Sequence, residues 1–96
     1  MNDFAGRVAV ITGTTGIGRA IALRFAAGGA HVVACGIEPA GNEALARDSA
    51  RLGLTLRVEQ CDVTVFDQVQ SVIAKTVRQF GGLDIIHNNA GLNTGR

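Results

Sequence analysis

A glycine-rich stretch at residues 12–18, Thr-Gly-Thr-Thr-Gly-Ile-Gly, constrains the fold of this chain more than any other feature. An apolar, β-branched run at residues 8–11 precedes it, and a helical pattern at residues 18–27 follows it. Glycine allows a sharp reversal from strand to helix and leaves no Cβ between the backbone and a ligand. The first N–H groups of a helix have no partner within it and lie at its positive end, which suits an anion such as pyrophosphate. The pattern favours a phosphate-binding turn over the alternative, an ordinary strand-to-helix turn that binds nothing.

The glycine spacing departs from the dinucleotide fingerprint G-x-G-x-x-G. Gly16 and Gly18 provide the inner G-x-G, but Ile21 stands where the third glycine belongs. The stretch instead reads Gly13-x-x-Gly16-x-Gly18. The strand before the turn and the helix after it are therefore needed to support the phosphate-site interpretation.

Composition indicates one small domain and argues against several classes of partner. The 96 residues suffice for a single domain, residues 1–96, and 47% of them are hydrophobic, with a mean hydropathy of +0.25. A hydrophobic fraction this high in a short chain is expected when the strands are buried on both faces, as in a parallel sheet. The net charge of +1, without charged blocks, argues against nucleic acid, and no apolar run is long enough to span a membrane. The first seven residues are too polar for a signal peptide, so we expect a cytoplasmic protein.

Two cysteines, Cys35 and Cys61, each end an apolar run. They do not have the C-x-x-C spacing that is typical of metal or redox sites, so we expect no metal site. We expect both to be small buried hydrophobic residues in a reducing compartment.

Hydrophobic periodicity divides the chain into four strands and three helices in strict alternation. The expected strands are residues 7–12, 30–35, 54–59 and 83–87, and the expected helices are residues 18–27, 39–52 and 65–80. A βαβαβαβ order predicts right-handed crossovers and a parallel sheet with helices on both faces. The expected strand order is 3-2-1-4, which makes the chain part of a Rossmann fold, the doubly wound α/β class. The third strand alternates apolar and polar residues, so we place it at a sheet edge.

The large apolar residues of each helix predict which face it buries. The predicted faces are Ile17, Ile21 and Phe25 in the first helix, Ala44, Leu45 and Leu52 in the second, and Phe66, Val69, Ile73, Val77 and Phe80 in the third. The face of the second helix is thin, so we expect that helix near the sheet edge.

The glycine and polar motifs all fall where an expected strand ends, at residues 13–18, 36–38, 62–63 and 88–91. In an open parallel sheet, ligands bind at the carboxyl ends of the strands where the strand order reverses, here between the first and fourth strands. The motifs therefore converge on one predicted site.

Three motifs, in this order and separation, resemble the short-chain dehydrogenase/reductase family: Thr12-Gly13…Gly16-Ile17-Gly18, Asp62-Val63 and Asn88-Asn89-Ala90-Gly91. The resemblance covers residues 4–91, which is nearly the whole chain. It implies an NAD(P)-dependent oxidoreductase that transfers hydride between the cofactor and an alcohol or carbonyl compound. This chain would be the N-terminal cofactor-binding portion.

The resemblance also implies roles for individual residues. The glycine turn would line the cofactor pyrophosphate and pack the first helix on the first strand. The cofactor-binding residues of this turn would be Gly13, Thr15, Gly16, Ile17 and Gly18. Asp62 would hydrogen-bond the adenine amino group, with Val63 beside the ring, whereas a helix cap or a surface carboxylate is the alternative for Asp62.

The loop after the fourth strand has implied roles as well. Asn89, Ala90 and Gly91 would contact the adenosine ribose region, and Asn88 would brace the central strands. Asparagines that stabilise their own turn are the alternative, and the two interpretations are compatible. His87 stands where the family usually has an apolar residue, and we expect it to be a hydrogen-bonded core residue and not a catalyst.

Two departures from the family pattern concern the cofactor. The family has three residues between its first two glycines, whereas this chain has Thr14 and Thr15, so the backbone N–H groups of the turn should be shifted. After the second strand, an acidic residue would hold the ribose 2′-OH of NAD and a basic one would favour NADP. Gly36 and Ile37 occupy that place, Glu38 lies next to it, and no Lys or Arg is adjacent, which favours NAD over NADP.

The third departure concerns the chemistry. The family uses a Tyr-x-x-x-Lys segment downstream of the Asn-Asn-Ala-Gly loop, in which the tyrosine exchanges a proton with the substrate oxygen. This chain contains no tyrosine and its sequence stops at Arg96, so we expect a truncated chain without catalytic residues and with very slow hydride transfer. A non-catalytic adenine-nucleotide-binding module and an inactive remnant are the alternatives. The family's usual homo-oligomeric contacts use later helices, so they predict no oligomeric state here.

Overall fold

The computed structural model describes residues 3–88, in which strands and helices alternate as predicted. The elements are β1 (Val8–Thr12), α1 (Gly16–Ala27), β2 (His31–Gly36), α2 (Pro39–Arg51), β3 (Leu56–Gln60), α3 (Phe66–Phe80) and β4 (Ile85–Asn88). Their bounds lie within two residues of the expected ones, and the largest change at the site is that α1 begins at Gly16 and not at Gly18. The segments read from hydrophobic periodicity are therefore confirmed.

The four strands form one parallel sheet with the order β3-β2-β1-β4. This confirms the predicted α/β class and the 3-2-1-4 order. β1 is central, and its last residue, Thr12, is in register with Cys35 of β2 and Asn88 of β4, so the carboxyl ends of these strands lie side by side. β3 is the predicted edge strand and is only partly buried.

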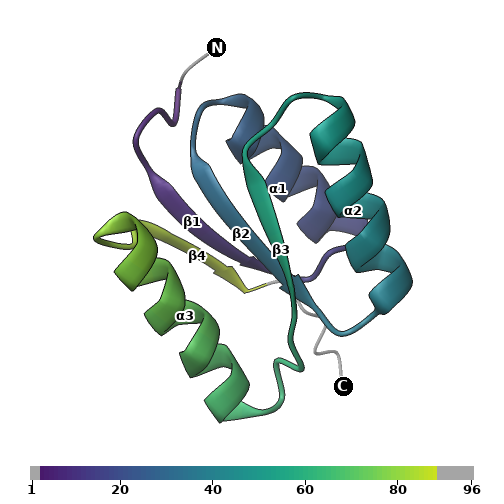
Figure 1. Cartoon of the computed structure of the whole chain (residues 1–96), viewed down its shortest axis with the longest axis vertical. Helices are drawn as coiled ribbons and strands as arrows, with labels where there is room; N and C mark the ends of the chain where they lie inside the picture. Colours follow the sequence, from purple (N-terminus) through teal and green to yellow (C-terminus); the bar gives the residue numbers. More distant parts are fainter. Residues whose placement is uncertain (1–2, 89–96) are drawn as a thin grey trace.

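The sheet separates two hydrophobic clusters. Figure 1 shows α1 and α2 on one side of the sheet, here called the α1/α2 face, and α3 on the other, here called the α3 face. The α1/α2 face buries Ala9, Ile11, Ala22, Ala26, Ala30, Val32, Ala34 and Leu45. The α3 face buries Val10, Val33, Cys35, Cys61 and Val72. Successive strand residues alternate between the two clusters, as the pleat of a strand requires.

α1 packs on the sheet through small residues, so its predicted face is wrong in part. Gly18, Ala22 and Ala26 are buried. Ile21 and Phe25 are only partly buried at the margin of the cluster, and Ile17 is 68% exposed. The helix lies so close to the strands that only small side chains fit beneath it, and the larger ones are displaced to its flanks.

α3 buries a face that is shifted from the predicted one. Val72 and Thr76 are buried, whereas Phe66 is 72% exposed and Val77 is 41% exposed. Thr76 tolerates burial because its hydroxyl donates to the Val72 carbonyl oxygen at 2.8 Å within the helix. The prediction is therefore wrong for Phe66 and Val77.

α2 packs against β2 and β3, near the sheet edge as predicted. Its buried residues are Asn42, Leu45 and Ser49. Leu52, which was expected on the buried face, is exposed. Two of the three buried residues are polar, so hydrophobicity alone does not identify this face.

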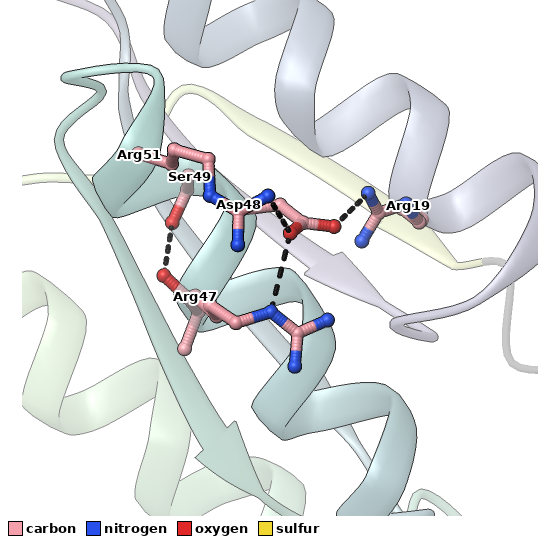
Figure 2. Close-up of polar contacts among 6 residues, drawn as sticks. Arg19, Arg47, Asp48, Ser49 and Arg51 are labelled. Atoms are coloured by element: carbon pink, nitrogen blue, oxygen red, sulfur yellow. Dashed lines mark hydrogen bonds and ion pairs between the residues drawn. The ribbon is translucent and has the colours of Figure 1, made fainter.

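A partly buried ion pair joins α1 to α2. Figure 2 shows Arg19 of α1 pointing toward Asp48 of α2, and the Nη2–Oδ2 distance is 2.6 Å. Arg47 and Arg51 also approach the Asp48 carboxylate, at 3.4 and 3.9 Å. The hydrogen bond from Arg19 is the main reason why the pKa of Asp48 lies below its usual range. The guanidinium of Arg19 is thus held by α2.

Cys35 and Cys61 are buried free thiols on the α3 face, as predicted. Burial, together with the neighbouring Cys61 thiol, raises the pKa of Cys35 to about 12. The Cys35 thiol is therefore protonated at neutral pH.

Candidate functional site

The glycine turn connects β1 to α1 at the carboxyl end of the sheet. Gly13 has φ +100° and Gly16 has φ +57°, a region of backbone conformation that favours glycine. The Gly13 N–H donates to the Cys35 carbonyl oxygen at 2.7 Å, which ties the turn to the end of β2. The turn is therefore fixed by backbone geometry and by a neighbouring strand.

The first turn of α1 presents N–H groups that no side chain caps. Thr15 is the N-cap residue, with φ −127° and ψ 165°, and it makes no side-chain cap hydrogen bond. The first turn contains no acidic residue either. These N–H groups lie at the positive end of the helix dipole, so an anion is favoured there.

Gly18 and Ile17 have different environments, although both were expected to pack α1 on β1. Gly18 is buried, which agrees with that role. Ile17 is 68% exposed, so its side chain does not pack on the sheet. Any contact of Ile17 with a cofactor stays a prediction.

A hydrogen-bonded network joins the glycine turn to α2, β2 and β3. The Thr14 hydroxyl donates to Asn42 Oδ1 at 2.6 Å. Asn42 Nδ2 donates to the Gly36 carbonyl oxygen at 3.0 Å and to Gln60 Oε1 at 2.9 Å. Gln60 Nε2 in turn donates to the Ile37 carbonyl oxygen at 2.7 Å. Thr14 and Asn42 are both buried.

Gly36 ends β2 where the glycine turn comes closest. A Cβ at this position would collide with Thr14 Oγ1 and would lie 2.9 Å from Asn42 Oδ1, so only glycine fits. An acidic side chain therefore has no room at position 36. Glu38 is exposed, is the N-cap residue of α2 and makes no side-chain cap hydrogen bond. Its carboxylate is the acidic group that follows β2 most closely in the chain.

Asp62 follows β3 and organises the turn before α3. Its Oδ1 accepts the Thr64 N–H at 3.0 Å and the Thr64 hydroxyl at 2.7 Å, and these bonds lower the pKa of the carboxyl group. The N-cap residue of α3 is Val65 and not Asp62. Val63 packs at the margin of the α3-face cluster. Asp62 thus has a structural role in the turn, and its contact with adenine stays a prediction.

The end of β4 completes the candidate site only in part. Asn88 is in register with Thr12, next to the glycine turn, whereas Asn89, Ala90 and Gly91 lie outside the described residues. His87 is half-buried, and its Nδ1 is buried without a hydrogen-bond partner among residues 3–88. The expectation of a hydrogen-bonded core histidine is therefore wrong for this ring nitrogen. β4 and β1 meet where the strand order reverses, which is the predicted place for a ligand.

Sequence reasoning missed Thr14, Asn42 and Gln60. The available signal was Asn42, a polar residue three positions before Leu45 on the buried face of α2. A buried polar side chain usually has hydrogen-bond partners, but its partners here come from three other segments of the chain.

The arrangement suits an anionic ligand that extends across the strand ends. The uncapped start of α1 attracts phosphate, and the exposed Glu38 accepts hydrogen bonds from hydroxyl groups. Within residues 3–88, no three His, Cys, Asp or Glu side chains are grouped to hold a metal ion. No helix in the same part of the chain is long and apolar enough to cross a membrane.

Comparison with known proteins identifies the family. Residues 7–96 match the family model for short chain dehydrogenases. The chain is 40% identical over 89 residues to 3beta-hydroxysteroid dehydrogenase 2 of Eggerthella lenta, covering 92% of this chain and 34% of that protein. It is 42% identical over 89 residues to L-fucose dehydrogenase of Oryctolagus cuniculus, covering 92% of this chain and 30% of that protein.

A solved structure agrees with the sequence comparisons. The crystal structure of a short chain dehydrogenase from Mycobacterium smegmatis superposes with a TM-score of 0.85 at 35% identity, covering 96% of this chain and 40% of that one. The chain thus spans about a third of the length of its curated relatives. A parallel sheet with the 3-2-1-4 order, an uncapped helix start at its centre and a family match over residues 7–96 lead to one conclusion: the chain belongs to the short-chain dehydrogenase family and corresponds to its N-terminal, cofactor-binding part.

Proposed function

We propose that this chain binds NAD across the carboxyl ends of its strands, as the cofactor-binding part of an oxidoreductase. The observation that carries the proposal is the uncapped start of α1 beside the reversal between β1 and β4. Members of the family use NAD or NADP, both of which carry a pyrophosphate. A pyrophosphate at this helix start gains hydrogen bonds from free N–H groups and a favourable dipole.

The proposed site residues form three groups, one for each part of the cofactor. The pyrophosphate would lie over the turn, next to Gly13, Thr15, Gly16, Ile17 and Gly18. The adenine ring would lie between the strand ends, with its amino group on Asp62 and its face against Val63. The adenosine ribose would reach Asn89, Ala90 and Gly91. The hydrogen bonds from Thr64 lower the pKa of the Asp62 carboxyl group, and a carboxylate is a good acceptor for an amino group.

The choice of NAD over NADP is supported by the charges near the end of β2. Glu38 is exposed and offers a carboxylate to the ribose 2′-OH, whereas a 2′-phosphate would be repelled. Arg19, a cation in the first turn of α1, is bound by Asp48 of α2 at 2.6 Å. The end of β2 thus has an acidic group for a hydroxyl, and the cation next to the glycine turn is already paired with Asp48.

For the whole protein we propose hydride transfer between NAD and an alcohol or carbonyl compound. The 96 residues contain no tyrosine, so the proton-transferring tyrosine that the family implies is not among them. The relatives named above act on a hydroxysteroid and on L-fucose, which are both alcohols. The residues of this chain favour neither substrate.

A second candidate is a non-catalytic module that binds an adenine nucleotide, since the proposed contacts of these residues are all with the cofactor. The two candidates differ in the coding sequence around these 96 residues. A Tyr-x-x-x-Lys segment in frame after residue 96 supports the oxidoreductase, and its absence from the complete coding sequence supports the module.

The test is a thermal melt of the chain, titrated with NAD, NADP or AMP. A ligand at about 100 times its Kd stabilises the folded state by about 2.7 kcal/mol. For a domain of this size that raises the melting temperature by roughly 10 to 20 °C. We expect NAD and AMP to raise it, and NADP to raise it less. A melt that no nucleotide shifts would overturn the proposal.

The variant Glu38→Gln sharpens this test. Removing the carboxylate should reduce the preference for NAD over NADP by about tenfold, since a charged hydrogen bond and a repulsion are both lost. Glu43→Gln, the same change at an exposed position of α2, is the matched control and should leave the preference unchanged. An unchanged preference in Glu38→Gln would remove this residue from cofactor selection.

A further inference from the structure

The network around Asn42 is a buried polar feature of the described chain that the proposed cofactor contacts do not use. Asn42 is 8% exposed and makes three side-chain hydrogen bonds, to Thr14, Gly36 and Gln60. Buried amides usually have hydrogen-bond partners, and the partners of Asn42 join four segments of the chain. Here the segments are the glycine turn, the end of β2, the start of α2 and the end of β3.

The orientation of the Asn42 amide follows from its partners. Nδ2 faces two oxygens that only accept, the Gly36 carbonyl and Gln60 Oε1, whereas Oδ1 faces the Thr14 hydroxyl, which donates. Rotating the amide by half a turn would place its oxygen against those two acceptors. Gln60 is oriented in the same way, because its Nε2 donates to the Ile37 carbonyl oxygen. Each side chain of the network therefore donates a hydrogen bond to the next, beginning at Thr14 and ending at the Ile37 carbonyl oxygen.

The same network explains why the turn and α2 lie so close together. Gly36 leaves space that Thr14 Oγ1 fills, and a Cβ at Gly41 would lie 2.6 Å from Thr15 Cγ2. Both threonines belong to the shortened glycine turn, which is one residue shorter than the family pattern. The hydrogen bond from Thr14 to Asn42 thus joins the turn to α2. The lack of a side chain at Gly36 and Gly41 leaves room for Thr14 and Thr15.

We propose that Asn42 is a positioning residue: through Thr14 and Gln60 it fixes the glycine turn against the segment 36–38 and sets the spacing between the pyrophosphate and ribose sides of the site. The proposal rests on the proposed function, because it concerns the same NAD site. It assigns Asn42 no contact with the cofactor. Its physical basis is that a ligand spanning two parts of a site binds best when those parts are already held at the right distance.

The first test measures how the turn is held, without any nucleotide. Thr14→Val removes the hydroxyl and keeps the shape, whereas Thr14→Ser keeps the hydroxyl. We expect faster amide hydrogen exchange at residues 13–16 in Thr14→Val and parent-like exchange in Thr14→Ser. Thr76→Val is the matched control, because Thr76 is also buried and donates to a carbonyl oxygen, on the α3 face. Unchanged exchange at residues 13–16 in Thr14→Val would overturn the proposal.

The second test compares NAD with AMP, which lacks the pyrophosphate bridge. In Thr14→Val, the Kd for NAD should rise about three- to tenfold, and the Kd for AMP should change by less than about twofold. A merely structural role would weaken both ligands in the same proportion, through loss of folded protein. Thr14→Ser should restore NAD binding, and Thr76→Val should leave both ligands unchanged.

Asn42→Ala provides a double-mutant cycle with Thr14→Val. If the two residues act as one unit, the double variant should bind NAD no more weakly than the weaker single variant. Independent effects that multiply would overturn the proposal while leaving the proposed function intact. A parent chain that binds neither NAD nor AMP would overturn the proposed function, and the positioning role would fail with it.

Discussion

The two faces of the sheet are packed in different ways. The α1/α2 face buries a cluster of eight residues, five of them alanine, whereas the α3 face buries five residues. Polar links also join the elements of the first face: Arg19 to Asp48, and Thr14 to Asn42. On the α3 face, Phe66, Val77 and Ile86 remain exposed. The helix that begins at the proposed cofactor site thus packs over a cluster rich in alanine, whereas the cluster beneath α3 is smaller and contains no alanine.

The largest expected effect comes from enlarging a residue beneath α1. Ala22 is fully buried in the cluster of the α1/α2 face, so Ala22→Leu must displace the helix or the sheet. We expect the free energy of unfolding to fall by about 1 to 3 kcal/mol. Ala74→Leu, the same change at an exposed position of α3, should stay within about 0.5 kcal/mol of the parent. Urea unfolding measures both.

Equal effects of the two substitutions would contradict the comparison. If Ala22→Leu is tolerated as well as Ala74→Leu, the α1/α2 face is not closely packed. The exposure of Ile17, which was predicted to be buried, would then need another explanation.

The next effect concerns pH and the α3 face. Burial and the Cys61 thiol raise the pKa of Cys35 to about 12. A group whose pKa is higher in the folded state stabilises it below the unfolded pKa, and this contribution is lost as the pH rises toward the folded pKa. With 9.0 as the unfolded value, stability should fall by about 1.4 kcal/mol between about pH 8 and about pH 10.

The assignment of this alkaline loss to Cys35 can be tested by substitution. The chain has no tyrosine, one lysine, Lys75, and one other cysteine, Cys61. Cys35→Ala should be less stable at neutral pH because it leaves a small cavity, but its stability should depend less on pH above about pH 8. The same alkaline slope in Cys35→Ala and in the parent would show that another group is responsible.

The sequence predicted the order of elements and the strand order, because those depend on periodicity and on chain connectivity. It failed on which side of a helix is buried. The apolar recurrence of Ile17, Ile21 and Phe25 predicted the buried side of α1, yet Ile17 is exposed and the small residue Ala22 is buried in the cluster. Thr76 was overlooked as a polar residue, although its hydroxyl is satisfied within the helix. Helix depth and local hydrogen bonds are properties of the packed chain and leave little trace in hydrophobicity.

The candidate site, too, could be predicted from the sequence only in part. The glycine turn and Glu38 were predicted, because a turn after a strand has a recognisable pattern. The Thr14–Asn42–Gln60 network was not, because it joins residues 28 and 18 positions apart by hydrogen bonds that no local pattern encodes. The need for glycine at position 36 likewise follows only from the position of the Thr14 hydroxyl.

The smallest expected effect is a gain in stability at the start of α3. α1 and α3 both begin without a side-chain cap, at Thr15 and at Val65. We interpret the open N–H groups of α1 as serving an anion, whereas none of the proposed cofactor contacts uses those of α3. Val65→Ser should therefore raise the free energy of unfolding by about 0.5 to 1 kcal/mol, since serine caps helices well and adds no charge beside Asp62 and Asp67.

The matched control for this capping prediction lies in the same helix. Val77 is 41% exposed, close to the 39% of Val65, but it lies in the last turns of α3 and not at its start. Val77→Ser should leave the free energy of unfolding unchanged or lower it by a few tenths of a kcal/mol, because position 77 is far from the unpaired N–H groups at the start of the helix. A gain in both variants would point to relief of exposed apolar surface, and a gain in neither would mean that the turn formed by Asp62 and Thr64 already satisfies the start of α3. A gain in Val65→Ser alone would show that α3 lacks a cap that its surroundings accept, so that its open N–H groups, unlike those proposed for α1, can be satisfied by a side chain of the chain itself.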